Sequence, residues 1–224
     1  MKFRPALMAA LCVAAIAVTA PLPGYALEKQ GPVTDADVVT AQSYTDLAKA
    51  FGQDTLAFVA IDEVGGRMMM EFLGDGETLE NWTRMVTVNV MGLPEDEAAQ
   101  APMMFNYIDS FRSHILSQKE QGMAVEMKGF SGFSKTPPDV SDENAPPPQH
   151  ALYQFAIGKD KADEDNAGIV FPLEGRLVNF QVQRRNGKTV SADEVAILQN
   201  ILMNTINGDG AVTTDNNKTK IKEE

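Results

Sequence analysis

The sequence predicts a single α+β domain, a layered sandwich in which a mostly antiparallel β-sheet of about six to seven strands is covered by about two to three amphipathic helices. Three observations predict this fold class. Short segments of alternating apolar and polar residues recur along the 224-residue chain, tight Gly-Gly or Glu-Gly turns separate some of them, and longer segments repeat apolar residues at the helical period. We place this domain at residues 27–206.

The strands are predicted from the alternation of their side chains. Residues 55–62 and 67–73 flank the Gly65-Gly66 turn and therefore form a hairpin. Because such turns are short, neighbouring strands are expected to pair in the antiparallel direction. The other expected strands are Thr83–Met91, 123–133, 151–157, 168–173 and Arg176–Arg184.

Two of these strands have clearly different faces. Thr83–Met91 places three valines on one face. In Arg176–Arg184, the apolar residues Val178, Phe180 and Val182 point one way, and the side chains between them, all amides, point the other way. We expect the apolar faces to lie against helices in the core.

Three segments are expected to be helical. Thr34–Phe51 has two aspartates near its start and a glycine at its end, and Ser191 with Glu194 forms a capping box that opens a helix reaching residue 206. The clearest helix follows Pro94 and ends at Gly122. It carries one continuous apolar stripe, formed by Met104, Ile108, Phe111 and Ile115.

The first 26 residues are typical of a secretory signal peptide. Lys2 and Arg4 precede an apolar run, and the small residues Gly24 and Ala26 fit a cleavage site after Ala26. The alternative is an uncleaved anchor, but the run is about fifteen residues, short of the roughly 20 that span a bilayer. We therefore expect a periplasmic or secreted protein with no stable membrane anchor after cleavage of residues 1–26.

Cleavage also changes the composition of the chain. The single cysteine, Cys12, leaves with the leader, which excludes disulfides and thiolate chemistry from the remaining chain. The net charge is −12 for the whole chain and near −14 without Lys2 and Arg4. Such an acidic protein is not expected to bind nucleic acid, because the phosphate backbone would repel it.

Two segments are expected to lie outside the folded core. Residues 134–149 contain five prolines and no apolar periodicity, so they predict an exposed loop. Residues 207–224 are polar and are expected to form a disordered tail. Within the loop, Pro146, Pro147 and Pro148 are candidate partner-binding residues because prolines favour extended segments that dock well.

The order of elements resembles the PsbP-like/DcrB-like group. The resemblance rests on Trp82-Thr83 opening a strand, on the amphipathic helix after it and on the C-terminal helix over 195–206, and it covers roughly residues 34–206. It implies a small α/β/α sandwich domain, often exported, of a kind that acts as an accessory or partner-binding module rather than an enzyme. It assigns no functional residues to this chain.

No motif in the sequence specifies a reaction. No Gly-x-Ser-x-Gly turn and no glycine-rich phosphate loop occurs, and only two histidines, His114 and His150, are present. We expect His114 to be a partly exposed structural residue and His150 to be solvated beside the proline-rich loop. A non-enzyme without a cofactor is therefore the expectation, with a carboxylate-dependent hydrolase as an alternative because acidic residues are abundant.

A weak calcium pattern occurs in the acidic segment. Asp163, Asp165 and Glu174 fall at positions 1, 3 and 12 of an EF-hand loop template. Ala167 occupies position 5, where a ligand is needed, and Pro172 lies inside the segment. The alternative is a solvated acidic turn between two strands, and no other metal site is expected.

The leading functional hypothesis is a non-catalytic exported protein that binds another envelope protein or assists its assembly. Trp82, the only tryptophan, is a candidate anchor for that partner, although covering one end of the core is the commoner role for such a residue and the one we favour. The alternative hypothesis is a protein that binds a small ligand or a divalent metal ion. Its methionines, including the run 68–70, are interpreted as flexible core residues.

Overall fold

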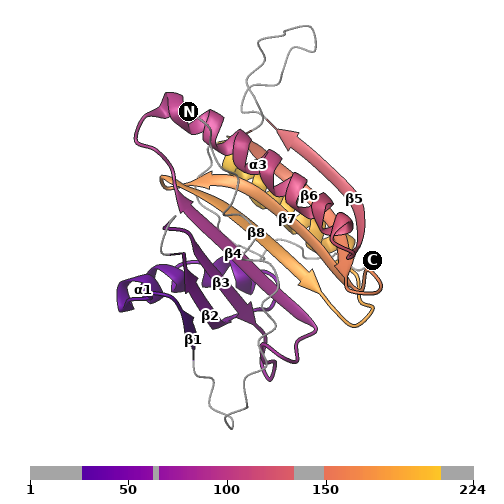
Figure 1. The fold of residues 1–224 in the computed structure, drawn as a ribbon. Helices are drawn as coiled ribbons and strands as arrows, with labels where there is room; N and C mark the ends of the chain where they lie inside the picture. The colour runs from indigo at the N-terminus through magenta and orange to yellow at the C-terminus, as the bar shows by residue number, and fades with distance from the viewer. Residues whose placement is uncertain (1–26, 63–65, 134–148, 208–224) are drawn as a thin grey trace, which may run out of the picture.

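The computed structural model describes residues 27–62, 66–133 and 149–207. These residues form one sheet with the strand order β1-β2-β3-β4-β8-β7-β6-β5, together with four helices (Figure 1). The leader at 1–26, the loop at 134–148 and the tail at 208–224 lie outside the described residues. The strands are β1 Glu28–Gln30, β2 Thr55–Ile61, β3 Met68–Leu73, β4 Arg84–Gly92, β5 Ala124–Phe133, β6 His150–Gly158, β7 Glu164–Leu173 and β8 Arg176–Arg184.

The sheet confirms the expected α+β class and its mostly antiparallel pairing. All neighbouring strands pair in the antiparallel direction except β1, which runs parallel to β2. The described residues contain eight strands, one more than the upper expectation. The additional strand, β1, has three exposed residues, too few to show any alternation.

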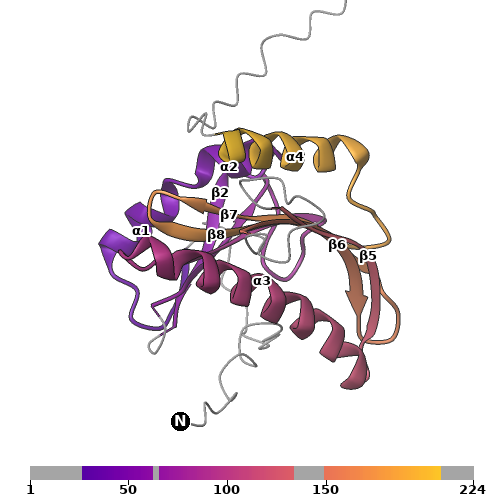
Figure 2. The same cartoon turned by 90° about the horizontal axis from the view of Figure 1, so that it is seen from above.

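One face of the sheet is covered by the helices α1 (Asp35–Gln42), α2 (Thr45–Lys49) and α4 (Ala192–Asn207) (Figure 2). As expected, the valines of β4 and the apolar residues of β8 point into this layer, which is the larger core. The helix expected at 34–51 is divided in two at Ser43 and Tyr44, where the Ser43 hydroxyl also donates a hydrogen bond to the carbonyl of Thr40. The buried centre of this layer includes Val86, Val88, Val178, Phe180, Leu198 and Leu202.

Among the described helices, only α3 (Glu97–Glu120) lies on the opposite face, and it covers part of that face. Its expected stripe is confirmed: Met104, Ile108 and Ile115 are buried, and the Phe111 ring lies 4.9 Å from the ring of Tyr153 on β6. The helix lies over β5 and β6 and reaches β8 near Leu177.

The other half of that face is not crossed by any helix among the described residues (Figures 1 and 2). Residues on β3 and β4 that alternate with the core residues point to this side. We call the part of the sheet formed by Met69, Glu71, Thr87 and Asn89 the uncovered face; Thr87 is buried between its neighbours, and the other three side chains are half-buried. Met91, at the end of β4, lies between the uncovered face and α3.

Candidate functional site

A buried network of polar side chains lies beside the uncovered face, beneath α3. The Tyr153 hydroxyl oxygen is 2.6 Å from Asn179 Oδ1 and 3.0 Å from Gln181 Oε1. Asn179 Nδ2 donates to the Tyr107 hydroxyl at 3.0 Å, and Gln181 Nε2 donates to Asn166 Oδ1 at 2.7 Å. Buried amides must be hydrogen-bonded, so each side chain fixes the orientation of the next.

The network requires a glycine on β7. A Cβ atom at Gly168 would lie 2.3 Å from the Tyr153 hydroxyl oxygen and 2.7 Å from the backbone oxygen of Phe180. Gly168 pairs with both Tyr153 and Gln181 in the sheet. The absence of a side chain at this position therefore lets the tyrosine ring lie across β7 and reach the amides of β8.

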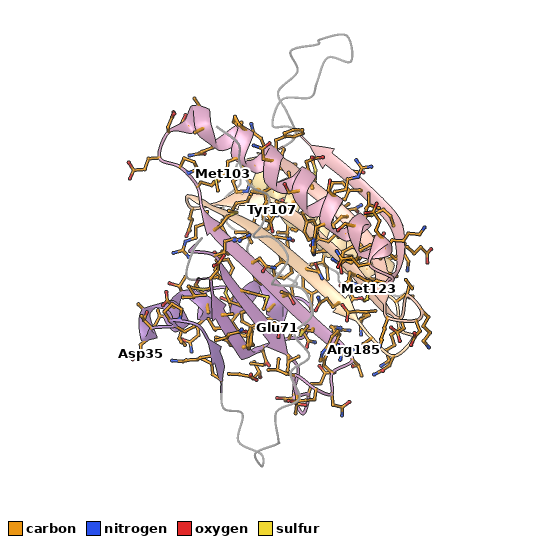
Figure 3. All side chains as sticks on the ribbon, in the orientation of Figure 1. Asp35, Glu71, Met103, Tyr107, Met123 and Arg185 are labelled. Carbon is orange, nitrogen blue, oxygen red and sulfur yellow. The ribbon has the colours of Figure 1, made fainter. Side chains whose placement is uncertain are left out.

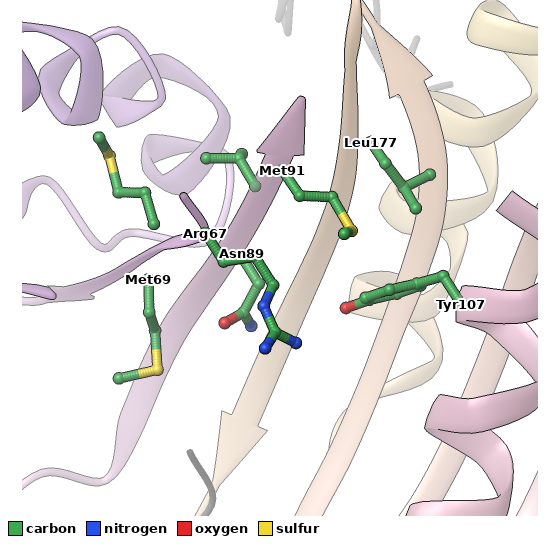
Figure 4. Close-up of a pocket in the computed structure, with 8 residues that line it drawn as sticks. Arg67, Met69, Asn89, Met91, Tyr107 and Leu177 are labelled. Carbon is green, nitrogen blue, oxygen red and sulfur yellow. The ribbon is translucent and has the colours of Figure 1, made fainter. Parts of the chain in front are cut away.

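A small pocket of about 60 Å³ opens where α3 meets the uncovered face (Figure 4). A drug-sized ligand needs roughly 300–1,000 Å³, so this pocket has room for a few water molecules or one small group. Its walls combine thioethers, a guanidinium, an amide and a phenol. They are formed by Arg67, Met68, Met69, Asn89, Val90, Met91, Tyr107 and Leu177.

Glu71 and Arg185 lie below α3 in the view of Figure 3, and their charges act on each other. The Arg185 guanidinium lies 4.0 Å from the centre of the Trp82 ring and 3.6 Å from Glu164 Oε2. Burial, followed by the nearby charges of Glu164 and Glu28, raises the pKa of Glu71 to about 7. Burial also raises the pKa of Glu164, although Arg185 opposes the shift.

The calcium candidates do not come together in the structure. Residues 164–173 form a continuous strand, so Asp163 and Glu174 lie at its opposite ends, about 35 Å apart at 3.3 Å per residue. Asp165 is already engaged, accepting from Lys128 Nζ at 2.8 Å and from the backbone N–H of Val190 at 2.9 Å. An EF-hand-like loop over these residues is therefore contradicted by the extended backbone of β7.

Trp82 lies in the core, which is one of the two roles expected for it, and not on the surface as a partner anchor would. It is 2% exposed and packs with Leu73 and Met85 at one end of the sheet. Pro146, Pro147 and Pro148 lie outside the described residues. The candidate anchor is therefore covered by its own chain, and one face of its ring is occupied by Arg185.

The expectation for one of the two histidines is confirmed, and the expectation for the other is wrong. His114 is half-buried on α3, as expected, with its Nε2 atom 3.4 Å from Gln118 Nε2. The expectation of a solvated His150 was wrong, because this residue is the first of β6 and is only 3% exposed. Among the described residues, no group of three or more His, Cys, Asp or Glu side chains could hold a metal ion.

Sequence reasoning missed the residues that now define the candidate site. It assigned the amides of β8 to the side away from the apolar residues but did not recognise that two of them, Asn179 and Gln181, are buried and bonded to tyrosines. It also passed over Glu71, a single carboxylate in the otherwise apolar strand Met68–Leu73. A charged residue at such a position was the available signal, because few strands place one there without a function or a partner.

The comparisons with known proteins give a faint similarity in fold. No protein-family model matches the sequence, and no curated protein is significantly similar to it. Among solved structures, the chain is similar to the solution structure of cyanobacterial PsbP (CyanoP) from Synechocystis sp. PCC 6803, with a TM-score of 0.30 and 10% identity, over 66% of this chain and 87% of that chain. This is a weak PsbP-like resemblance in fold alone.

The described residues also contain no helix long and apolar enough to cross a membrane. Taken together, the site offers amide donors and acceptors, one half-buried carboxylate and flexible thioethers on a sheet surface. This combination suits recognition of another surface, since it provides adaptable apolar contacts beside oriented hydrogen-bonding groups.

Proposed function

We propose that this chain is a non-catalytic exported protein that binds another envelope protein through the uncovered face. The observation that carries the proposal is that α3 covers only the β5–β6 side of its sheet face, leaving Met69, Glu71 and Asn89 half-buried without a covering helix among the described residues. Antiparallel sheets can leave one face in water, so the support for docking comes from the side chains on this half, a flexible thioether beside a carboxylate and an amide. Export is part of the proposal and is supported by the signal-like residues 1–26.

The composition of the uncovered face supports a protein partner over a small ligand. The pocket at its rim, about 60 Å³, is too small for most organic ligands. Methionine is over-represented on surfaces that adapt to protein partners, because its side chain is flexible and polarisable. Met69 and Met91 therefore suit a broad contact better than a closed site.

A carboxylate-dependent hydrolase is a second candidate, favoured by one observation. The pKa of Glu71 is raised to about 7 by burial and by Glu164 and Glu28, a value that suits a general acid or base near neutral pH. However, Glu71 does not line the pocket beside α3. A Glu71→Gln variant that removes a measured hydrolytic activity, with the fold intact, would favour this candidate over docking.

Site-specific photo-crosslinking tests the docking proposal. With p-benzoylphenylalanine in place of Met69, we expect one discrete adduct in intact cells that make and export the protein. Met203, another methionine, is 47% exposed on α4, on the opposite side of the sheet, and provides the matched control position. The adduct should be absent when the crosslinker replaces Met203.

The partner protein captured in the adduct must then bind the chain without the crosslinker when the two proteins are purified and mixed. Equal crosslinking from both positions, or no adduct from the Met69 position, would contradict docking on the uncovered face. An adduct from Met203 alone would place the partner on the helical side of the molecule.

A further inference from the structure

Glu71 occupies the middle of the uncovered face. On β3 it pairs with Phe58 of β2 and with Thr87 of β4, so strands flank it on both sides. The side chain is half-buried, and among the described residues no hydrogen bond and no ion pair within 4 Å reaches its carboxylate. A carboxylate in such a place loses part of its hydration without gaining a bonded partner.

The charges around Glu71 are mainly negative. Glu28 on β1 and Glu164 on β7 act on it from two and three strands away, and Arg185, which follows β8, supplies the opposing charge. Arg185 is itself held 3.6 Å from Glu164 and over the ring of Trp82. Arg67, the guanidinium beside Met69 and Asn89, lies 3.0 Å from Asp62 Oδ2. Both guanidiniums thus already have a carboxylate partner, and the carboxylate of Glu71 is left for a cation from outside.

We propose that the partner docked on the uncovered face places a lysine or arginine side chain against Glu71. This inference rests on the proposed function and specifies the chemistry of the partner. A second copy of this chain is a poorer occupant, because each copy carries a net charge of −12, or near −14 without residues 1–26, and the two would repel each other. A basic patch on another protein would instead be attracted to this surface and oriented by it.

This pairing makes docking dependent on pH. The pKa of Glu71 is raised to about 7 in the free protein by burial and by Glu164 and Glu28. A cation binds the ionised carboxylate, so docking lowers that pKa and releases a proton where Glu71 is still protonated. Affinity should therefore be highest above pH 7 and should fall as the pH drops below it.

The test uses acetyl-trilysine amide as the cationic probe, titrated into the ¹⁵N-labelled protein at low ionic strength and followed by NMR. At pH 8 we expect the largest shift changes at Met69, Glu71, Thr87 and Asn89. Glu71→Gln should weaken binding roughly threefold. Glu120→Gln, which removes an exposed carboxylate at the end of α3, is the matched control and should leave the affinity unchanged.

Lowering the pH from 8 to 6 should weaken binding to the unsubstituted protein more than binding to Glu71→Gln. The inference is overturned if the chemical-shift changes spread over the acidic surface without a maximum on the uncovered face. It is also overturned if Glu71→Gln binds the probe as tightly as Glu120→Gln does. Concentration-dependent association of the protein through the same residues, without the probe, would identify a second copy as the occupant and also overturn it. If the crosslink from the Met69 position forms but the trilysine probe causes no shift changes, only this inference is refuted. If that crosslink does not form, the docking proposal itself is refuted.

Discussion

Replacing Gly168 with alanine is expected to lower the free energy of unfolding by about 3 kcal/mol, measured by urea denaturation followed by far-UV circular dichroism. The new Cβ atom would lie 2.3 Å from the hydroxyl oxygen and 2.5 Å from Cζ of Tyr153, and 2.7 Å from the backbone oxygen of Phe180. The tyrosine would have to leave its position across β7. Its hydrogen bonds to Asn179 and Gln181 would then be lost, leaving buried amides unsatisfied.

Gly92→Ala is the matched control, since Gly92 is also in a strand and a Cβ there meets nothing within 4 Å. It should change the stability by less than about 0.5 kcal/mol. Combining Gly168→Ala with Tyr153→Phe should cost less than the sum of the two single changes, because the phenylalanine removes one of the clashing atoms. Equal effects of the two glycine substitutions would show that the network does not depend on the missing side chain at Gly168.

Replacing Glu194 with glutamine is expected to cost about 3 kcal/mol of stability at neutral pH. Glu194 is 6% exposed and accepts from Arg184 Nη2 at 2.8 Å, and its carboxylate lies 3.2 Å from Arg84 Nε. It also accepts from the backbone N–H of Ser191 at the start of α4. The neutral amide would leave two guanidiniums near each other without a compensating charge, and α4 would be held less firmly on the sheet.

The pH dependence of this effect follows from the pKa of Glu194. Burial acts to raise that pKa, but the hydrogen bonds from Ser191 and Arg184 and the charges of Arg184 and Arg84 lower it below its usual value of 4.5. A lowered pKa in the folded state stabilises the protein above the unfolded pKa, and this contribution is lost as the pH falls through the folded pKa. The difference between Glu194→Gln and the unsubstituted protein should therefore shrink in acid.

Asp46→Asn provides the control for this second prediction. It removes an exposed ion pair, Lys49–Asp46 at 3.3 Å, and should change the stability by no more than about 0.5 kcal/mol. A Glu194→Gln effect as small as that of Asp46→Asn, or one that grows in acid, would contradict the assigned role of the buried charges.

Much of the fold was predictable because local patterns and tertiary packing agree. The bounds of Arg176–Arg184 were predicted to the residue, since its apolar and amide residues alternate strictly and its ends are charged. The capping box at Ser191 is confirmed by the hydrogen bonds between Ser191 and Glu194. The early start of β7 was missed, because Glu164, Asp165 and Asn166 are poor strand formers that are held in the sheet by pairing with Ile157, Ala156 and Phe155.

The candidate site was much less predictable, since it depends on strands that are distant in the sequence. Asn179 on β8 and Tyr107 on α3 are 72 residues apart, and no local pattern indicates that they bond. Nor does any local pattern show which half of a sheet face a helix covers. The apolar stripe of α3 predicted that the helix packs on a sheet, but the choice of β5 and β6 is a property of the topology.

Methionine oxidation footprinting tests the central claim, that the uncovered face is where another protein docks. The mature protein would be oxidised briefly with hydrogen peroxide, alone and in the presence of the purified partner that crosslinking identified. The oxidised fraction of each methionine would then be measured by mass spectrometry. We predict that the partner slows oxidation of Met69 and Met91, which lie on the uncovered face and at its rim, and leaves the exposed Met203 of α4 unchanged. Unchanged oxidation of Met69 and Met91, or protection of Met203 alone, would contradict the claim.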